Sequence, residues 1–113
     1  MTSRKTKATR YKIWLRPAVH ATRKKLPGHI RQRIKRTIDR LAEMPRPHHS
    51  KELALSDNIN PTIASEWEVR RVRLEDWRIV YGINESWEEV AILTIQKRPP
   101  YDYEDLERLL SEL

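Results

Sequence analysis

The sequence predicts an α+β fold in which helices pack on one face of a mainly antiparallel four-stranded sheet. Residues 67–83, WEVRRVRLEDWRIVYGI, alternate apolar and charged side chains around Glu75-Asp76, which is typical of a β-hairpin. Residues 28–44 instead carry one apolar stripe at helical spacing, made of Ile30, Ile34, Ile38 and Leu41. The expected order is strand, helix, helix, strand, strand, strand, helix.

The first strand and the two helices that follow it come from the N-terminal part. Residues 10–16 alternate apolar with polar or exposed positions, and Pro17 ends this strand and begins a short helix over 17–26. Trp14 is out of phase with the apolar positions, so we expect it to be exposed. The Pro27-Gly28 corner then joins the short helix to the longer one, which predicts an antiparallel helical hairpin.

Residues 45–65 have no sustained period and contain three prolines, which predicts a long loop. We interpret it as an insertion or as a mobile flank of an active site, with Leu53 and Leu55 attaching it to the core. Its His48-His49 pair is the only histidine pair that could approach the arginine-rich strand. As a metal site the pair lacks further ligands at suitable spacing.

The hairpin has two different faces if Glu75-Asp76 is a two-residue turn. One face is the predicted core side, with Val72, Leu74, Trp77, Ile79, Tyr81 and Ile83. The other face holds Arg71, Arg73, Arg78, Val80 and Gly82. Trp67 and Val69 do not follow the core-side alternation, which indicates a bulge or a strand that begins near Arg70.

Arg73 and Arg78 face each other across this hairpin, although like charges directly opposite destabilise a sheet. The planar guanidinium group matches phosphate oxygens, and Val80 and Gly82 are expected to leave the neighbouring surface open. We therefore interpret this face as a phosphodiester-binding surface.

The last strand and a closing helix complete the fold. Residues 89–98 form the third consecutive strand, which ends near the hairpin turn with Lys97 and Arg98. Four or five cationic groups should therefore converge at one end of the sheet. Trp87 precedes this strand and is expected to be exposed. The closing helix begins at Tyr103 and repeats leucines at Leu106, Leu109, Leu110 and Leu113.

Composition limits the class of protein. The 113 residues suit one domain, which we place at 10–113 behind a basic tail at 1–9. The net charge of +7 favours a polyanionic partner. The absence of cysteine excludes disulfides and thiolate metal sites. With no run of about 18 apolar residues, we expect a cytoplasmic protein that makes no use of a membrane.

Several stretches share their order and spacing with one known family. They are LP..I..RI...I..L...P.P in 26–47, Lys-x-Leu at 51–53, RRVRLEDWRIVYGI, AILTIQKR and YEDLERLL. Together they resemble the RelE/ParE superfamily of bacterial toxin-antitoxin toxins over roughly residues 10–113. For the RelE branch, the resemblance implies a ribosome-dependent endoribonuclease that cuts mRNA in the decoding A site, with a cognate antitoxin as partner and no cofactor.

The resemblance also implies a set of site residues. The basic and tyrosine positions of the family match Arg71, Arg73, Arg78, Arg98 and Tyr103, with Tyr101 as a competing choice for the tyrosine. Further RNA contacts are expected from Lys51, Arg70, Lys97 and Tyr101. The implied chemistry is attack of a ribose 2′-OH on the adjacent phosphate, with arginines stabilising the added charge. Arginine is a poor general base, so the base stays open.

Two other functions fit the same fold. A ParE-like inhibitor of DNA gyrase would bind its target without nuclease chemistry, and a non-catalytic RNA-binding domain would bind without cleaving. The filled set of arginines favours phosphodiester cleavage. The closing helix is acidic and leucine-rich, which predicts docking on the chain's own sheet; in some family members the antitoxin competes at this position.

Overall fold

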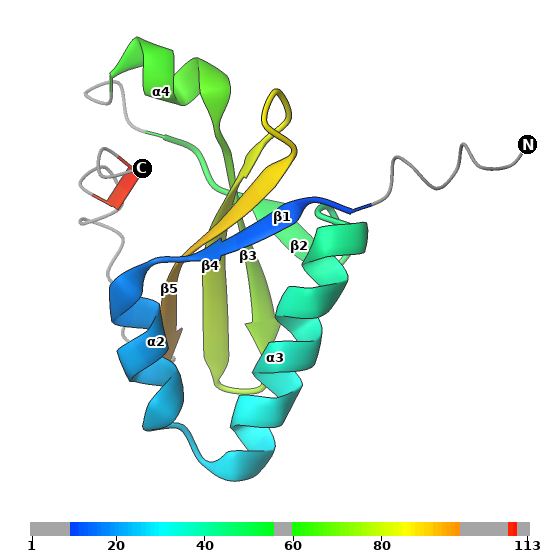
Figure 1. Ribbon diagram of the computed structural model, residues 1–113, viewed down its shortest axis with the longest axis vertical. Helices are drawn as coiled ribbons and strands as arrows, with labels where there is room; N and C mark the ends of the chain where they lie inside the picture. The colour runs from blue at the N-terminus through cyan, green and yellow to red at the C-terminus, as the bar shows by residue number, and fades with distance from the viewer. Residues whose placement is uncertain (1–9, 56–59, 98–108, 111–113) are drawn as a thin grey trace, which may run out of the picture.

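A five-stranded mixed sheet with two helices, α2 and α3, on one face forms the fold (Figure 1). The computed structural model describes residues 10–55, 60–97 and 109–110. Its elements are β1 (Lys12–Leu15), α2 (Pro17–Lys24), α3 (Gly28–Glu43), β2 (Ser50–Glu52), α4 (Pro61–Glu66), β3 (Glu68–Leu74), β4 (Trp77–Asn84) and β5 (Glu89–Lys97). The strand order is β1-β5-β4-β3-β2, with only the β1–β5 pair parallel. The predicted α+β class is confirmed.

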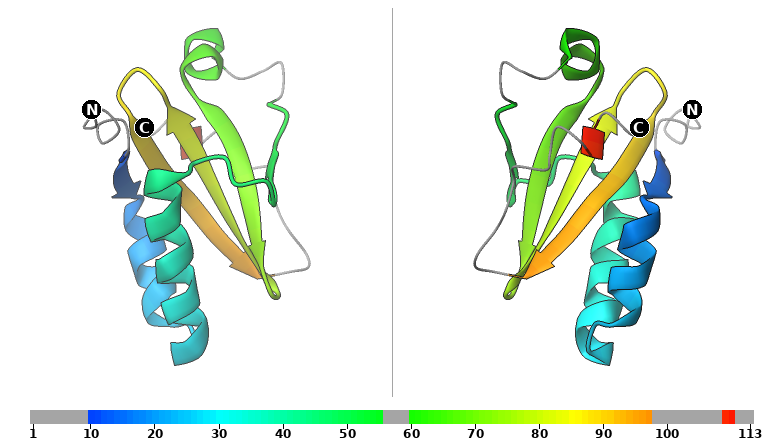
Figure 2. Two further views of the ribbon diagram at one scale, coloured as in Figure 1. Left: turned by 90° about the vertical axis from the view of Figure 1, so that its right-hand side faces the viewer. Right: turned by 90° about the vertical axis from the view of Figure 1, so that its left-hand side faces the viewer.

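The helical hairpin covers one face of the sheet, as the sequence predicts. Figure 2 shows α2 and α3 side by side along this face. Pro17 occupies the first turn of α2, where its missing N–H costs no helical hydrogen bond. The predicted stripe of α3 is buried against the sheet, at Ile30, Ile34, Ile38 and Leu41. We call this side of the sheet the helix face.

The helix face also carries the core side of the hairpin. Its buried strand residues include Val72, Ile79, Tyr81, Ile83, Val90, Ile92 and Ile95. The hydroxyl of Tyr81 donates a hydrogen bond to the carbonyl of Pro45 at 2.7 Å, which satisfies the only polar atom of this buried side chain. The predicted hairpin register is confirmed, with Arg73 opposite Arg78 and Leu74 opposite Trp77.

A second core lies on the opposite side of the sheet, which we call the second face. Trp67, Val69, Val80, Ala91, Leu93, Leu109 and Leu110 form it, and Leu53, Leu55 and Ile63 pack against its margin. Leu109 and Leu110 are helical, so at these two positions the closing helix docks on the sheet as predicted. The rest of that predicted helix lies outside the described residues.

The second core corrects the prediction that Val80 and Gly82 leave an open surface. Val80 is fully buried, and the ring of Trp67 covers Gly82 so closely that a Cβ there would lie 3.0 Å from Trp67 Cε3. The alternation of Trp67 and Val69 therefore reflects a second buried face. It marks neither a bulge in β3 nor a strand that begins at Arg70, because β3 begins at Glu68.

The irregularity lies in β5 instead. Val80 pairs with Thr94 and Tyr81 with Ile92, so Leu93 is an additional residue between two regular stretches. A bulge of this kind reverses which face each following residue occupies. Val90 and Ile92 lie on the helix face before it, and Ile95 lies there after it.

Residues 45–65 do not form the single long loop that was predicted. They contain β2, which pairs antiparallel with β3 and makes a fifth strand, and α4, whose first turn is capped by Asn60. The Asn60 side chain accepts a hydrogen bond from the backbone N–H of Thr62 at 2.8 Å. A strand of three residues shows too little alternation to be recognised in the sequence.

Candidate functional site

Four basic side chains lie together where the second core ends. Residues that pair directly across a ladder share a face of the sheet. Lys51 pairs with Arg71, Arg71 pairs with the second-core residue Val80, and Arg73 pairs with Arg78. The strands β2, β3 and β4 therefore present Lys51, Arg71, Arg73 and Arg78 on one surface. We call this set the arginine face.

The arginine face is accessible to a ligand. Lys51 and Arg73 are exposed, while Arg71 and Arg78 are half-buried. Beyond Val80 toward the hairpin turn, no apolar side chain of the described part of the chain occupies this surface. Neighbouring strands lie roughly 4.8 Å apart, and like charges on directly opposite residues are unfavourable, so the surface attracts anions. The arrangement suits a phosphate group, whose oxygens accept several guanidinium hydrogen bonds.

An ion pair holds the hairpin turn beside this surface. Glu75, the first residue of the turn, has a left-handed backbone with φ of 56°, and its carboxylate pairs with Arg33 of α3. The turn is therefore anchored to the helical hairpin rather than being a free loop. The contact links the turn that follows Arg73 to α3.

Arg70, which was expected to bind RNA, lies on the helix face opposite Tyr81. Its guanidinium group donates to Glu68 at 2.6 Å and to the Ser50 hydroxyl at 2.9 Å, and the side chain is 16% exposed. We therefore assign Arg70 a structural role. Its neighbour Arg71 points to the other side of the sheet because successive strand residues alternate.

The ion pair of Arg70 continues into a network at the end of the sheet away from the hairpin turn. Arg46 bridges Glu68 at 2.9 Å and Glu85 at 2.6 Å. Burial opposes ionisation of Glu68, but hydrogen bonds from Arg46 and Arg70 lower its pKa overall. These charges are neutralised within the fold.

Tyr11 extends the same network. Its hydroxyl donates to Glu85 at 2.7 Å, and this hydrogen bond, with a further one from Arg46, lowers the pKa of Glu85. The same bond and burial raise the pKa of Tyr11. The network joins the segment before β1, the α3–β2 connection, β3 and the β4–β5 turn, so it stabilises the fold.

Lys97 lies at the predicted end of the sheet, but on the helix face and not on the face that carries Arg73 and Arg78. It pairs with Trp77, whose side chain packs against the core of the helix face. The bulge at Leu93 is the reason, because it shifts the alternation of every later residue of β5. Thr94 and Gln96 lie on the second face instead, beside Val80 and Arg78.

Three predicted site residues, Arg98, Tyr101 and Tyr103, lie outside the described residues. Thr94, Gln96 and Arg16 were not singled out in the sequence, yet they lie next to the arginine face. The available signal was the alternation of polar Thr94 and Gln96 with Ile95 in an otherwise apolar strand.

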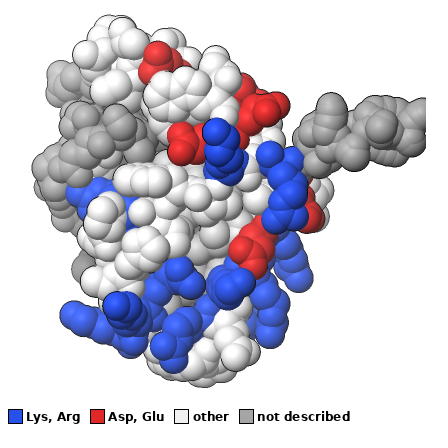
Figure 3. Space-filling model, viewed as in Figure 1, with Lys and Arg blue, Asp and Glu red and all other residues white. Residues whose placement is uncertain are grey.

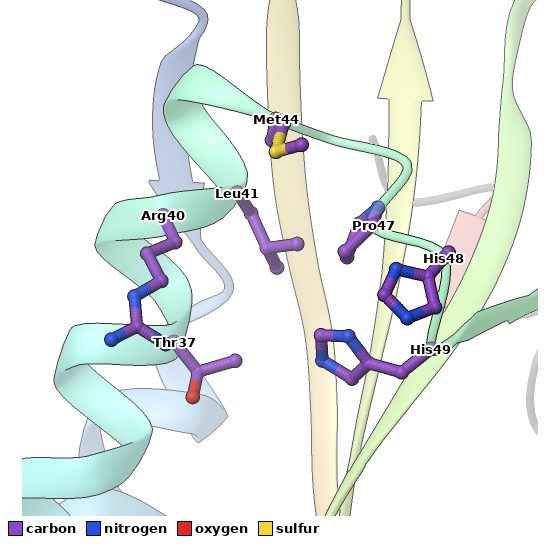
Figure 4. A pocket seen from close by; sticks show the side chains of 7 residues that line it. All are labelled: Thr37, Arg40, Leu41, Met44, Pro47, His48 and His49. Carbon is purple, nitrogen blue, oxygen red and sulfur yellow. The ribbon is translucent and has the colours of Figure 1, made fainter.

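The His48-His49 pair lies on the helix side of the fold, away from the arginine face. Figure 4 shows both imidazoles facing Thr37, Arg40 and Leu41 of α3 across a pocket of about 250 Å³. This pair was the one histidine candidate for an approach to the arginines, and it lies elsewhere. Within residues 10–55, 60–97 and 109–110, no three His, Cys, Asp or Glu side chains are placed to hold a metal ion.

Surface charge is divided between the two ends of the molecule. Figure 3 shows lysines and arginines over α2 and α3 and acidic side chains at the opposite end. The exposed basic residues of these helices include Lys24, Lys25, Arg31, Arg36 and Arg40. Trp14 and Trp87 are exposed as predicted, at 36% and 58%. No helix among the described residues has the length and apolar character needed to cross a membrane.

Solved structures of RelE toxins share this fold. The archaeal RelE–RelB complex of Pyrococcus horikoshii OT3 matches with a TM-score of 0.67 and 21% identity, covering 80% of this chain and 98% of that chain. The RelBE2 complex of Mycobacterium tuberculosis gives 0.62 and 19%, covering 81% and 95%. The isolated E. coli RelE toxin gives 0.62 and 17%, covering 88% and 98%.

The sequence itself matches a family. The model described as "ParE toxin of type II toxin-antitoxin system, parDE" matches residues 12–99. This span is most of the chain, so the chain belongs to this family and is a toxin of the RelE/ParE superfamily. No curated protein sequence matches it.

Proposed function

We propose that this toxin is a ribosome-dependent mRNA endoribonuclease. The observation that carries the proposal is the arginine face, in which Lys51, Arg71, Arg73 and Arg78 converge from three adjacent strands. A phosphodiester gains negative charge in its transition state, and several guanidinium groups on one surface can stabilise that charge. Inhibition of gyrase by binding alone involves no such transition state.

The reaction is attack of a ribose 2′-OH on the adjacent phosphorus. The new P–O bond forms as the bond to the 5′-oxygen of the next nucleotide breaks, which leaves a 2′,3′-cyclic phosphate and a 5′-OH. Arg73 and Arg78 stabilise the charge on the phosphoryl oxygens, and by the family resemblance Arg98 joins them. Tyr103 stacks on a base or takes part in proton transfer, because arginine stays protonated and cannot act as the base.

A cognate antitoxin and the ribosome are the proposed partners. The solved relatives from Pyrococcus horikoshii and Mycobacterium tuberculosis are complexes with an antitoxin, which supports an antitoxin as partner. The basic surface of α2 and α3 supports binding to the ribosome, because a positive surface attracts RNA before specific contacts form.

The test is a cell-free translation reaction in which mRNA ends are mapped by primer extension. We expect cuts that require ribosomes and that decrease roughly 100-fold or more in Arg78→Ala, the usual scale for one lost charge-stabilising donor. Lys12→Ala removes one positive charge from an exposed position of β1, outside the arginine face and outside the basic surface of α2 and α3, and should retain cleavage. Intact mRNA with folded wild-type protein would refute the proposal.

Inhibition of DNA gyrase is the second candidate, and the match to a ParE family model favours it. This function predicts that the protein inhibits supercoiling of DNA by gyrase and leaves mRNA intact in the translation reaction. The arginine face would then have no catalytic task, and Arg78→Ala would leave toxicity unchanged. Salt-sensitive RNA binding without cleavage would instead identify a non-catalytic RNA-binding protein.

A further inference from the structure

A small polar cavity lies beside the arginine face, on the outer side of β5. Arg16, Thr94 and Gln96 supply its polar groups, and Ala18, Val19, Thr22, Leu93 and Leu109 complete the lining. Gln96 pairs directly with Arg78, so the cavity begins one strand away from the Arg73–Arg78 pair, at roughly 4.8 Å. A nucleotide whose phosphate contacts Arg78 therefore has its base within reach of this cavity.

The volume of the cavity is about 170 Å³, which is large enough for one six-membered aromatic ring. An apolar protein cavity of about 150 Å³ accommodates benzene, so a six-membered base fits here. A purine needs additional room for its second ring. The volume is therefore sufficient for a pyrimidine base.

The lining has both parts that recognition of a base requires. Val19, Leu93 and Leu109 are buried apolar residues that can contact the faces of a ring. The amide of Gln96 carries a donor and an acceptor, the Thr94 hydroxyl provides either, and the Arg16 guanidinium provides donors only. The edges of cytosine and uracil present a carbonyl oxygen next to a second polar atom, which matches this set.

The strand pairing explains why Arg16, Thr94 and Gln96 lie beside the cavity. The bulge at Leu93 brings Thr94 and Gln96 to the second face, and β1 runs parallel to β5 so that Arg16 follows at the same edge. The backbone N–H of Arg16 donates to the carbonyl of Ile92 at 3.1 Å, which fixes this residue beside the cavity.

We propose that this cavity binds the base of a pyrimidine nucleotide adjacent to the scissile phosphate, with Gln96 and Thr94 as specificity-determining residues. The proposal rests on the endoribonuclease function above and adds the base preference at one position of its substrate. Single-stranded RNA is commonly read in this way, through hydrogen bonds to the edge of a base that is held out of its stack.

The test measures initial cleavage rates on ribosomes programmed with mRNAs that differ only at the nucleotide before or after the cut. At one of these positions, the wild-type protein should cut pyrimidines about 10-fold faster than purines, the scale of one paired base contact. Gln96→Ala should reduce this ratio to about 2 or less while purine rates stay within about twofold of wild type. Thr94→Val should reduce the ratio by a smaller factor.

Gln32→Ala on the exposed surface of α3 is the matched control and should leave the ratio unchanged. Equal cleavage of all four bases by the wild type, or a uniform decrease in Gln96→Ala, would overturn the base site while leaving the nuclease intact. If the wild type cleaves none of the mRNAs, the proposed function fails. In that case, NMR titration tests base binding in the cavity independently of cleavage. Cytidine monophosphate should shift the Gln96 side-chain amide signal more than adenosine monophosphate does. The absence of a shift would overturn the proposed base site.

Discussion

Arg70 and Arg71 are neighbours in one strand, yet they belong to different parts of the molecule. Arg70 lies on the helix face, where Glu68 and Ser50 bind its guanidinium group. Arg71 lies on the arginine face, beside Lys51 and close to the Arg73–Arg78 pair. The comparison teaches that a run of arginines in a strand serves two tasks, because alternation sends every second charge to the opposite face.

The two faces of the sheet differ in the same way on a larger scale. The helix face is covered by α2 and α3 (Figure 2) and carries the larger core. The second face is buried up to Val80 and becomes cationic beyond it. One face thus supplies stability along its length, while the other combines a smaller core with a cationic surface.

The largest expected effect compares the two cores directly. Ile79 and Val80 are consecutive, fully buried and on opposite faces. Ile79→Ala should lower the free energy of unfolding by roughly 2–5 kcal/mol through lost contacts and a new cavity. Val80→Ala should lower it by roughly 2 kcal/mol, since it removes fewer buried carbon atoms. Urea denaturation measures both, and a change below about 0.5 kcal/mol for Val80→Ala would contradict a second core.

Gly82 tests how closely the second core is packed. A Cβ in Gly82→Ala would lie 3.0 Å from the ring of Trp67, so the ring must shift. We expect a loss of about 1–3 kcal/mol, the usual cost of overpacking. Gly28→Ala is the control, because its Cβ would meet only the end of the Arg31 side chain at 3.9 Å. Thermal unfolding measures the melting temperatures of both variants. Equal values would contradict close packing of Trp67 on Gly82.

Substitutions of Arg70 and Arg71 should affect different properties, stability in the first case and RNA binding in the second. Arg70→Ala should destabilise the fold by about 1.5–3 kcal/mol, since it removes hydrogen bonds from a charged group. Arg71→Ala should have a smaller effect on stability, but it should reduce the salt dependence of single-stranded RNA binding by about 0.7 in the slope of log K against log salt. Fluorescence anisotropy at several salt concentrations measures the slope. The same slope change in Arg70→Ala would contradict its structural role.

The smallest expected effect is a dependence of stability on pH from the network around Arg46. Glu68 and Glu85 have lowered pKa values, so their contribution is present above their usual value near 4.5 and is lost as pH falls through the folded-state pKa. The groups are partly exposed, so each pair contributes at most about 1 kcal/mol. Arg46→Gln should therefore lower the melting temperature at pH 7 by a few degrees and have less effect near pH 3. Equal effects at both pH values would exclude the ion pairs as the cause.

Local patterns in the sequence predicted the parts of the fold whose interactions are local. The Glu75-Asp76 turn sets the register of β3 on β4, because a two-residue turn leaves only one pairing. The stripe of Ile30, Ile34 and Ile38 likewise specified the buried side of α3. The same alternation placed Arg71, Arg73 and Arg78 on one face of the hairpin.

Contacts between distant segments decided what local patterns could not. Trp67 covers Gly82, which was expected to leave an open surface, and Arg46 forms an ion pair with Glu68, 22 residues away in the sequence. One additional residue at Leu93 moved Lys97 to the helix face and brought Gln96 beside Arg78. The sequence by itself determined the β-hairpin, the helical hairpin of α2 and α3, and the cationic surface, because neighbouring residues carry that information. The tertiary structure decided which faces are buried and where the cavity forms, because burial depends on segments that meet only after folding.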